Sequence, residues 1–229
     1  MPFCDILIIS KKIVKGYKKT MDIKNVQLQN IVLTGCPRSG KTTVMEALRE
    51  SIAPGLTDVC FSFVKESATQ LLRKDADMPR KDPIYFQTRV ALTEYINEDG
   101  GLISLLGRPE PIKIQICDRG LCDLFVYLEA EQSSYISEMT PEYFLKRYSH
   151  VLYFSPYYAD EITEGNEFRY ETEDEILLRE RKGRDVWFRH KSCTEIPSFD
   201  DVNERIAYTA KVLNGLIGCD IFLIKDKYI

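Results

Sequence analysis

Short apolar runs recur along the chain and are separated by segments with a helical pattern. Each run carries apolar side chains at neighbouring positions without the strict alternation of a half-exposed strand. Strands buried on both faces have this pattern, because helices cover both sides of a parallel sheet. The sequence therefore predicts a parallel sheet with strands at residues 31–34, 58–64, 112–118, 150–155 and 219–225.

The segments between these strands have the spacing of amphipathic helices. In residues 41–50, Val44, Ala47 and Leu48 fall on one helical face. A polar stretch with prolines at 75–83 and a stretch with glycines and prolines at 100–111 are typical of connecting loops. We predict helices at residues 41–50, 65–74, 84–98, 121–130, 141–149 and 199–218, which gives an α/β fold.

The chain has 229 residues, a length that suits one domain with a sizeable core. Hydrophobic residues make up 44% and charged residues 29%, which are ordinary globular proportions. The net charge of −4 argues against a protein that coats nucleic acid. Because the regular pattern begins at about Asn30, we predict one domain over residues 28–229, preceded by an extension over residues 1–27.

The extension is rich in lysine, and two interpretations remain open. Its lysines could contact an anionic membrane or a protein partner, or they could form an ordinary solvated face. The residues concerned are Lys11, Lys12, Lys15, Lys18 and Lys19.

The seven cysteines are scattered and form no CxxC pair. This pattern favours reduced thiols without structural zinc. No apolar run approaches the roughly 18 residues that a membrane span needs. We therefore expect a cytoplasmic protein.

Residues 35–42, GCPRSGKT, match the phosphate-loop pattern GxxxxGK[ST] in full. Glycines let the backbone wrap a phosphate, and the N-terminus of the following helix attracts anions. Lys41 is expected on the β- and γ-phosphates and Thr42 on Mg²⁺, with ATP or GTP as the nucleotide. The predicted phosphate-binding residues are Gly35, Pro37, Arg38, Ser39, Gly40, Lys41, Thr42 and Thr43.

Further candidates follow two predicted strands. Asp118 ends the strand at 112–118, where open α/β sheets bind ligands, so it is a candidate for metal and substrate. Arg119 is a candidate anion contact, and Glu66 is a candidate general base. A surface Asp–Arg pair and a carboxylate at a helix start are the structural alternatives.

A charged segment over residues 160–191 is acidic first and basic second. Arg181 and Arg184, with Arg179 nearby, are candidates to neutralise charge on a transferring phosphoryl group, and Gly183 is a candidate hinge of a mobile lid-like segment. A solvated, salt-bridged helix explains the same residues.

Together these motifs resemble one family, the P-loop domain shared by the nicotinamide riboside kinase part of NadR-type proteins and the eukaryotic translocation-defect GTP-binding proteins. The matching pieces include GCPRSGKTT, VKESATQLL, ICDRGLCDLFVY and EFRYETEDE, in family order from about residue 30 to 224. The resemblance implies a three-layer P-loop NTPase of nucleoside- or nucleotide-kinase type, with Asp118, Arg119 and Arg169 at the substrate end. Thr69 stands where the family commonly has arginine.

The favoured function is an ATP- or GTP-dependent kinase with a small acceptor such as a nucleoside or nucleotide. The alternative is a nucleotide-binding switch with slow hydrolysis that binds a protein or lipid partner. A ring-forming mechanical ATPase fits less well, because the chain shows no separate helical lid domain.

Overall fold

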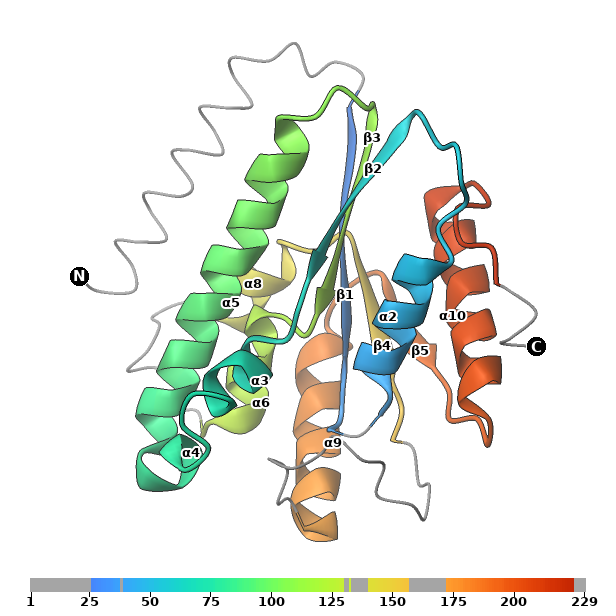
Figure 1. Ribbon diagram of the computed structural model, residues 1–229. Helices are drawn as coiled ribbons and strands as arrows, with labels where there is room; N and C mark the ends of the chain where they lie inside the picture. Colours follow the sequence, from blue (N-terminus) through green and yellow to red (C-terminus); the bar gives the residue numbers. More distant parts are fainter. Residues whose placement is uncertain (1–25, 38, 130–131, 133–139, 157–171, 225–229) are drawn as a thin grey trace.

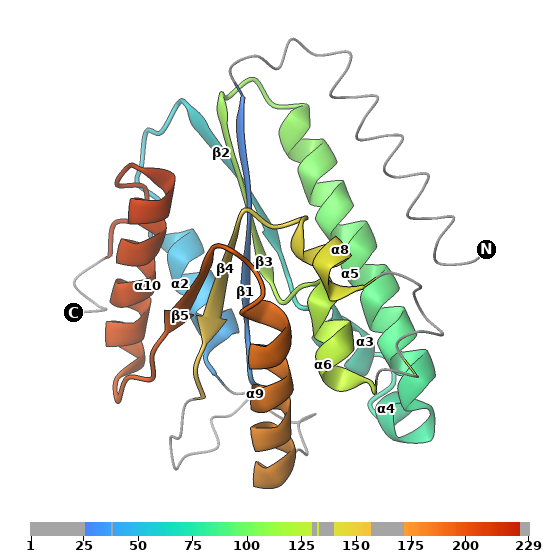
Figure 2. The same cartoon turned by 180° about the vertical axis from the view of Figure 1, so that it is seen from behind.

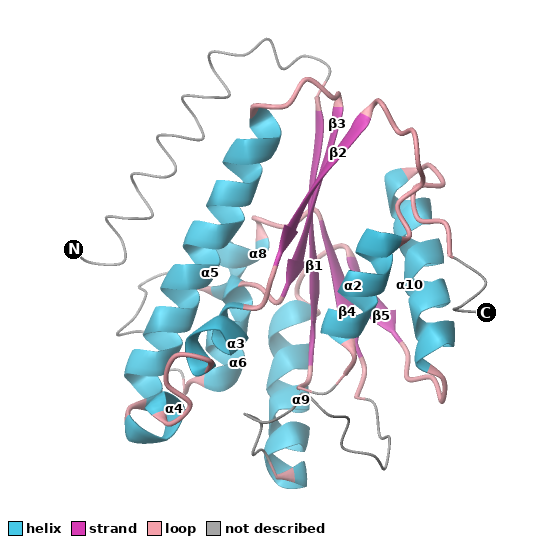
Figure 3. Cartoon of the chain, in the orientation of Figure 1, coloured by secondary structure: helices cyan, strands magenta, loops and turns pink. Residues whose placement is uncertain are grey.

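The computed structural model describes residues 26–37, 39–129, 132, 140–156 and 172–224. At its centre lies a sheet of five parallel strands in the order β2-β3-β1-β4-β5 (Figure 3). The strands are β1 (Gln27–Gly35), β2 (Val59–Val64), β3 (Ile112–Asp118), β4 (His150–Phe154) and β5 (Cys193–Ile196).

Helices cover both faces of the sheet, so the domain has three layers (Figures 1 and 2). One face carries α2 (Lys41–Glu50) and α10 (Val202–Ile217), and the other carries the remaining helices. These are α3 (Ser67–Leu72), α4 (Met78–Lys81), α5 (Pro83–Leu106), the 3₁₀ turn η1 (Leu121–Asp123), α6 (Leu124–Tyr127), α8 (Pro141–Leu145) and α9 (Glu173–Trp187). The predicted parallel three-layer α/β fold is confirmed.

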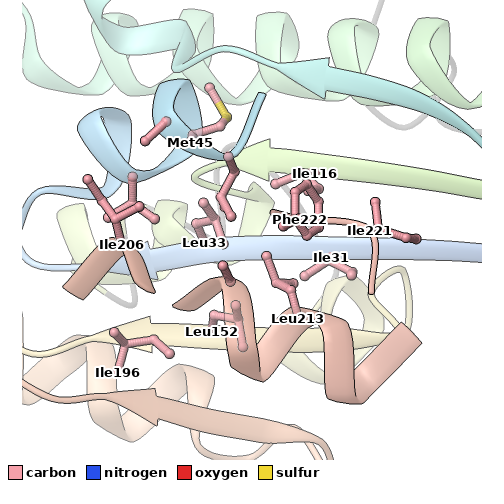
Figure 4. Close-up of a cluster of buried hydrophobic side chains, with 14 of the residues drawn as sticks. Ile31, Leu33, Met45, Ile116, Leu152, Ile196, Ile206, Leu213, Ile221 and Phe222 are labelled. Atoms are coloured by element: carbon pink, nitrogen blue, oxygen red, sulfur yellow. The ribbon is translucent and has the colours of Figure 1, made fainter. Parts of the chain in front are cut away.

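Alternate residues of each central strand enter the two hydrophobic layers. Ile31 and Leu33 pack with α2 and α10, as Figure 4 shows, whereas Val32 between them packs on the other side. The second layer includes Trp187 of α9, which is fully buried. Because helices cover both faces of the central strands, the sequences of these strands have buried residues at consecutive positions.

Helix α5 continues well beyond the predicted end at residue 98, so the loop expected at 100–111 is wrong over its first half. Of the two glycines that suggested this loop, Gly101 is required by close packing. A Cβ at Gly101 would lie 2.2 Å from Gln115 Oε1 and 2.5 Å from Ser62 Oγ, whereas a Cβ at Gly100 would meet nothing within 4 Å. Gly101 therefore permits close packing of the helix on the sheet, and it does not end the helix.

The fifth strand also differs from the prediction. Residues 193–196 form β5, and residues 219–224 contribute an isolated bridge between Ile52 and Phe222. The side chain of Asn214 accepts from the backbone N–H groups of Ile221 and Phe222 and donates to the Phe222 carbonyl. These bonds hold the segment against the end of α10, where Ile221 and Phe222 complete the core.

The stretch at 75–83, predicted as a loop, contains the short helix α4. Residues 1–25, which include the lysines of the predicted extension, lie outside the described residues, and the domain boundary at residue 28 stays a prediction. Among the described helices, none has the length and apolar character to cross a membrane.

Candidate functional site: a phosphate loop beside a pocket

The phosphate loop joins the end of β1 to the start of α2, at the carboxyl edge of the sheet. Gly35 has φ 124° and passes so close to β4 that a Cβ would lie 2.2 Å from the Phe154 carbonyl oxygen. Gly40 has φ 77° and forms the N-cap of α2. Both conformations favour glycine, and together they wrap the loop around the N-terminus of α2. This is the geometry that binds phosphate.

Lys41 lies inside this loop and is 4% exposed. Its Nζ donates to the carbonyl of Gly35 at 3.2 Å, to that of Cys36 at 2.5 Å and to Ser39 Oγ at 2.8 Å. The ammonium group is therefore already held within the loop, where it can bind a phosphate.

Arg205 of α10 also stabilises the loop, a role that was not predicted from the sequence. Its Nη1 donates to the Ser39 carbonyl and its Nη2 to the Ser155 carbonyl, each at 2.6 Å. The side chain is 1% exposed and links the loop to the end of β4. No spacing in the sequence signals this contact, because Arg205 lies in an amphipathic helix far along the chain.

Thr42 and Asp118 form the candidate metal site. Thr42 Oγ1 donates to Asp118 Oδ2 at 2.7 Å, and Asp118 Oδ1 is buried without a hydrogen-bond partner among the described residues. Burial, and then the negative charge of Glu66, raise the pKa of Asp118. An unpartnered oxygen beside a threonine hydroxyl fits Mg²⁺, which prefers oxygen ligands. Among the described residues, no group of three or more His, Cys, Asp or Glu could hold a metal.

Arg119 is buried and joins two carboxylates. Its Nε contacts Glu66 Oε1 at 2.5 Å, and its Nη1 contacts Asp123 Oδ2 at 3.2 Å. The φ of Arg119 is 74°, an unusual value for a residue other than glycine, and such values cluster at functional sites. Burial lowers the pKa of Arg119, but Tyr127, and then the carboxylates of Glu66 and Asp123, raise it well above its usual range, so the guanidinium is charged.

Thr69, where the sequence departs from the family, has a local role. Its hydroxyl donates to Glu66 Oε2 at 2.5 Å. Glu66 is therefore held at both oxygens, by Arg119 and by Thr69. The substitution replaces a cation at this position with a neutral group that orients the carboxylate.

A pocket of about 350 Å³ lies next to the phosphate loop. Pro37 of the loop, Glu66 and Arg119 line it, so the candidate base borders the phosphate site and the pocket together. The opposite wall comes from one face of α5: Phe86, Gln87, Val90, Ala91 and Glu94. The volume falls in the range that binds small molecules.

Helix α9 places the three candidate arginines in different environments. Arg179 lines the pocket and lies over the Tyr127 ring, 4.8 Å from its centroid. Arg181 is exposed, and Arg184 pairs with Glu180 at 2.7 Å and with Glu195. Of these three arginines, Arg179 lines the pocket, and the predicted Arg181 and Arg184 do not.

Glu180 connects α9 to the phosphate loop. It accepts from the Cys36 thiol at 2.8 Å and from the Tyr153 hydroxyl at 2.9 Å. Burial, and then this hydrogen bond, raise the pKa of the Cys36 thiol to about 12. Gly183 lies inside α9, where a Cβ would lie 2.6 Å from the Tyr153 hydroxyl, so close packing explains this glycine without a hinge.

The remaining predicted residues have varied positions. Ser39 is buried, and Thr43 is exposed in the first turn of α2. Arg38 and Arg169 lie outside the described residues, as do residues 160–171 of the charged segment.

Comparisons with known proteins agree with this geometry. A family model described as an AAA domain matches residues 30–205, so the chain belongs to that family. The solved structure of thymidylate kinase from Candida albicans is similar with a TM-score of 0.57 and 13% identity, over 83% of this chain and 92% of that one. At this identity the likeness shows a shared nucleotide-kinase-like fold. A search of curated proteins finds no significant match.

Proposed function

We propose that this member of the AAA domain family is an ATP- or GTP-dependent phosphotransferase that acts on a small acceptor such as a nucleoside or nucleotide. One observation carries the proposal. The phosphate loop shares a border with a pocket of about 350 Å³, and Glu66 lies at that border. A nucleotide switch needs the loop alone, whereas a kinase needs a second site beside it.

In this proposal the loop amides, the N-terminus of α2 and Lys41 bind the phosphates of the nucleotide. Thr42 and Asp118 hold Mg²⁺, which supplies charge neutralisation on the phosphates when it is bound. The unpartnered Asp118 Oδ1 supports this assignment.

Glu66 acts as the general base. The acceptor hydroxyl oxygen bonds to the γ-phosphorus, the bond from that phosphorus to the β–γ bridging oxygen breaks, and the nucleoside diphosphate leaves. The proton of the acceptor hydroxyl passes to Glu66, which Arg119 and Thr69 orient. Arg179 faces the same pocket and stabilises negative charge near the transferred group.

The resemblance to NadR-type kinases supports a nucleoside-like acceptor and a domain over residues 28–229. We infer a cytoplasmic location from the scattered cysteines. A contact of the N-terminal lysines with a membrane or a protein is a secondary proposal, which rests on their clustering alone.

The test is product formation, measured by mass spectrometry with ATP and GTP across nucleosides, nucleotides and nicotinamide riboside. Wild type should phosphorylate at least one acceptor. E66Q should lower that rate about 10³-fold while Mg²⁺–NTP still stabilises the protein. E46Q is the matched control, because Glu46 is exposed on α2 away from the pocket lining, and it should behave as wild type. No phosphorylated acceptor would refute the kinase and favour the switch.

A further inference from the structure

Glu94 is a buried acidic residue in the wall of the pocket. It lies on the face of α5 that also presents Phe86 and Ala91 to the pocket, and it is 3% exposed. Glutamate is rarely buried to this extent unless it is paired. Nothing in the proposed transfer step uses this side chain.

One carboxyl oxygen of Glu94 has no partner. A hydrogen bond with the Ser67 hydroxyl reaches the carboxyl group, and Asn97 Nδ2 donates to Ser67 Oγ at 3.3 Å. Glu94 Oε1 is buried and has no hydrogen-bond partner among the described residues. Buried polar atoms normally have partners, so an orphaned atom in a pocket wall points to a group that the ligand supplies.

A second orphaned oxygen shows why the position matters. Gln115 Oε1 is also buried without a partner among the described residues, yet it does not line the pocket. It lies opposite Gly101, at the packed contact between α5 and the sheet. The close contact with α5 leaves no room for a partner of the Gln115 oxygen, whereas Glu94 lines a pocket that can hold one.

We propose that Glu94 is a specificity-determining residue of the acceptor pocket, and that its unpartnered oxygen hydrogen-bonds the lactam edge of a nucleobase, where an N–H donor adjoins a C=O acceptor. The inference rests on the proposed function, since it names the acceptor class of the same pocket. It assigns nucleosides with a uracil-, thymine-, hypoxanthine- or guanine-type edge.

The charge of the surroundings supports a neutral carboxyl group. Burial, and then the negative charge of Glu98, raise the pKa of Glu94 well above its usual range, and Asp123 and Asp118 act in the same direction. A protonated carboxyl group offers one O–H donor and one acceptor oxygen. A lactam edge presents the complementary acceptor and donor, so both groups can be satisfied at once.

The apolar part of the pocket lining suits contact with a planar ring. Phe86, Ala91 and Leu124 give it an apolar wall, and each of them is buried. Such a wall can contact the faces of a base but cannot read its edge. Discrimination between bases must therefore come from the few polar groups of the pocket. Glu94 is one of them, and one of its oxygens is free of hydrogen-bond partners among the described residues.

The experiment measures nucleoside binding by titration calorimetry with Mg²⁺ and non-hydrolysable ATP or GTP analogues. The probes are uridine, thymidine, inosine and guanosine, each beside the counterpart methylated at the lactam nitrogen. Wild type should bind at least one parent about 10-fold more tightly than its methylated counterpart, the value of one hydrogen bond. E94Q keeps a donor and an acceptor and should retain the preference. E94M should bind both forms alike, and E94L repeats the test if E94M does not fold.

E46Q is again the control, because Glu46 is exposed on α2 outside the pocket lining, whereas a change at Glu98 would alter the charge that acts on Glu94. It should keep the preference. The inference is overturned if E94M keeps the preference for the parent nucleoside over its methylated counterpart, or if E94Q loses that preference as E94M does. It is also overturned if wild type binds none of the parent nucleosides. Phosphorylation of an acceptor by E94M with the same preference for the parent over its methylated counterpart as wild type would refute this inference and leave the kinase intact. Transfer to no acceptor would refute the kinase, and the binding results would still decide the role of Glu94.

Discussion

The hydroxyl of Thr42 donates a 2.7 Å hydrogen bond to Asp118 Oδ2, and this bond joins the first turn of α2 to the end of β3. The two residues come from motifs 76 positions apart in the chain. The contact brings the phosphate loop and the strand-end carboxylate into one site, where the second carboxylate oxygen has no partner among the described residues.

Replacement of Asp118 by Asn should remove the dependence on Mg²⁺ and keep the fold. Asn has nearly the size of Asp but lacks the carboxylate that we propose to hold Mg²⁺. Burial disfavours this carboxylate, so the ligand-free variant should be as stable as wild type or more stable. We expect a loss of about 10² or more in turnover. Thermal unfolding with NTP across a Mg²⁺ titration is the measurement. D58N, an exposed change before β2, is the control, and equal Mg²⁺ responses in all three proteins would contradict the assignment.

The arginines of α9 should differ in function. R179A should lower turnover about 10³-fold, because Arg179 lines the pocket, whereas R181A should have almost no effect. R184A should cost about 1 kcal/mol of stability or less, since its ion pairs are partly exposed. Steady-state kinetics and urea unfolding on the three variants separate these effects. A larger kinetic loss in R181A than in R179A would show that another arrangement of α9 is active.

Stability should depend on pH through Glu94. Its pKa is raised in the folded protein, so its contribution is present at acidic pH and is lost as the pH rises above the usual glutamate value toward the folded pKa. E94Q cannot ionise, and its unfolding free energy should therefore gain relative to wild type as the pH rises. Glu98 also has a raised pKa and should leave a residual slope. Urea unfolding from pH 4 to 8 tests this, and a difference between the two proteins that stays constant would contradict it.

Two adjacent glycines in α5 should respond oppositely to alanine. G101A would place a Cβ 2.2 Å from Gln115 Oε1 and should destabilise the protein by about 1–3 kcal/mol, because Gln115 is held by Asn30 and the Glu98 carbonyl. G100A has open space around it and should stabilise the helix by about 0.5–1 kcal/mol. Urea denaturation measures both. A stabilising G101A would show that α5 packs less closely than described.

The sequence predicts the phosphate loop and the ends of β1 and β3 well, because motif and apolar strand adjoin in each case. It could not predict β5, a short edge strand in which Ile196 is the buried residue. Ile221 and Phe222 have the same apolar character as a strand, but Asn214 diverts their backbone groups from the sheet.

Parts of the site depend on contacts that no local pattern encodes. Arg205 contacts Ser39, which lies 166 residues away in the sequence. The sequence also cannot distinguish the buried Glu94 from a glutamate on the solvent-exposed face of a helix. Among the three arginines, the choice of Arg179 follows from the rotation of α9, which Trp187 fixes through its bond to Asp123 Oδ1. These relationships need the packed fold.

The most direct test of the central claim is acceptor-stimulated nucleotide turnover. Nucleoside diphosphate and phosphorylated acceptor are quantified together, with and without the acceptor that the mass-spectrometric screen identifies. We expect turnover of wild type to rise about 10²-fold or more with acceptor, with one phosphorylated acceptor for each diphosphate, and we expect E66Q to lose this rise. Slow diphosphate formation that is the same with and without every acceptor, and the same in E66Q, would contradict it.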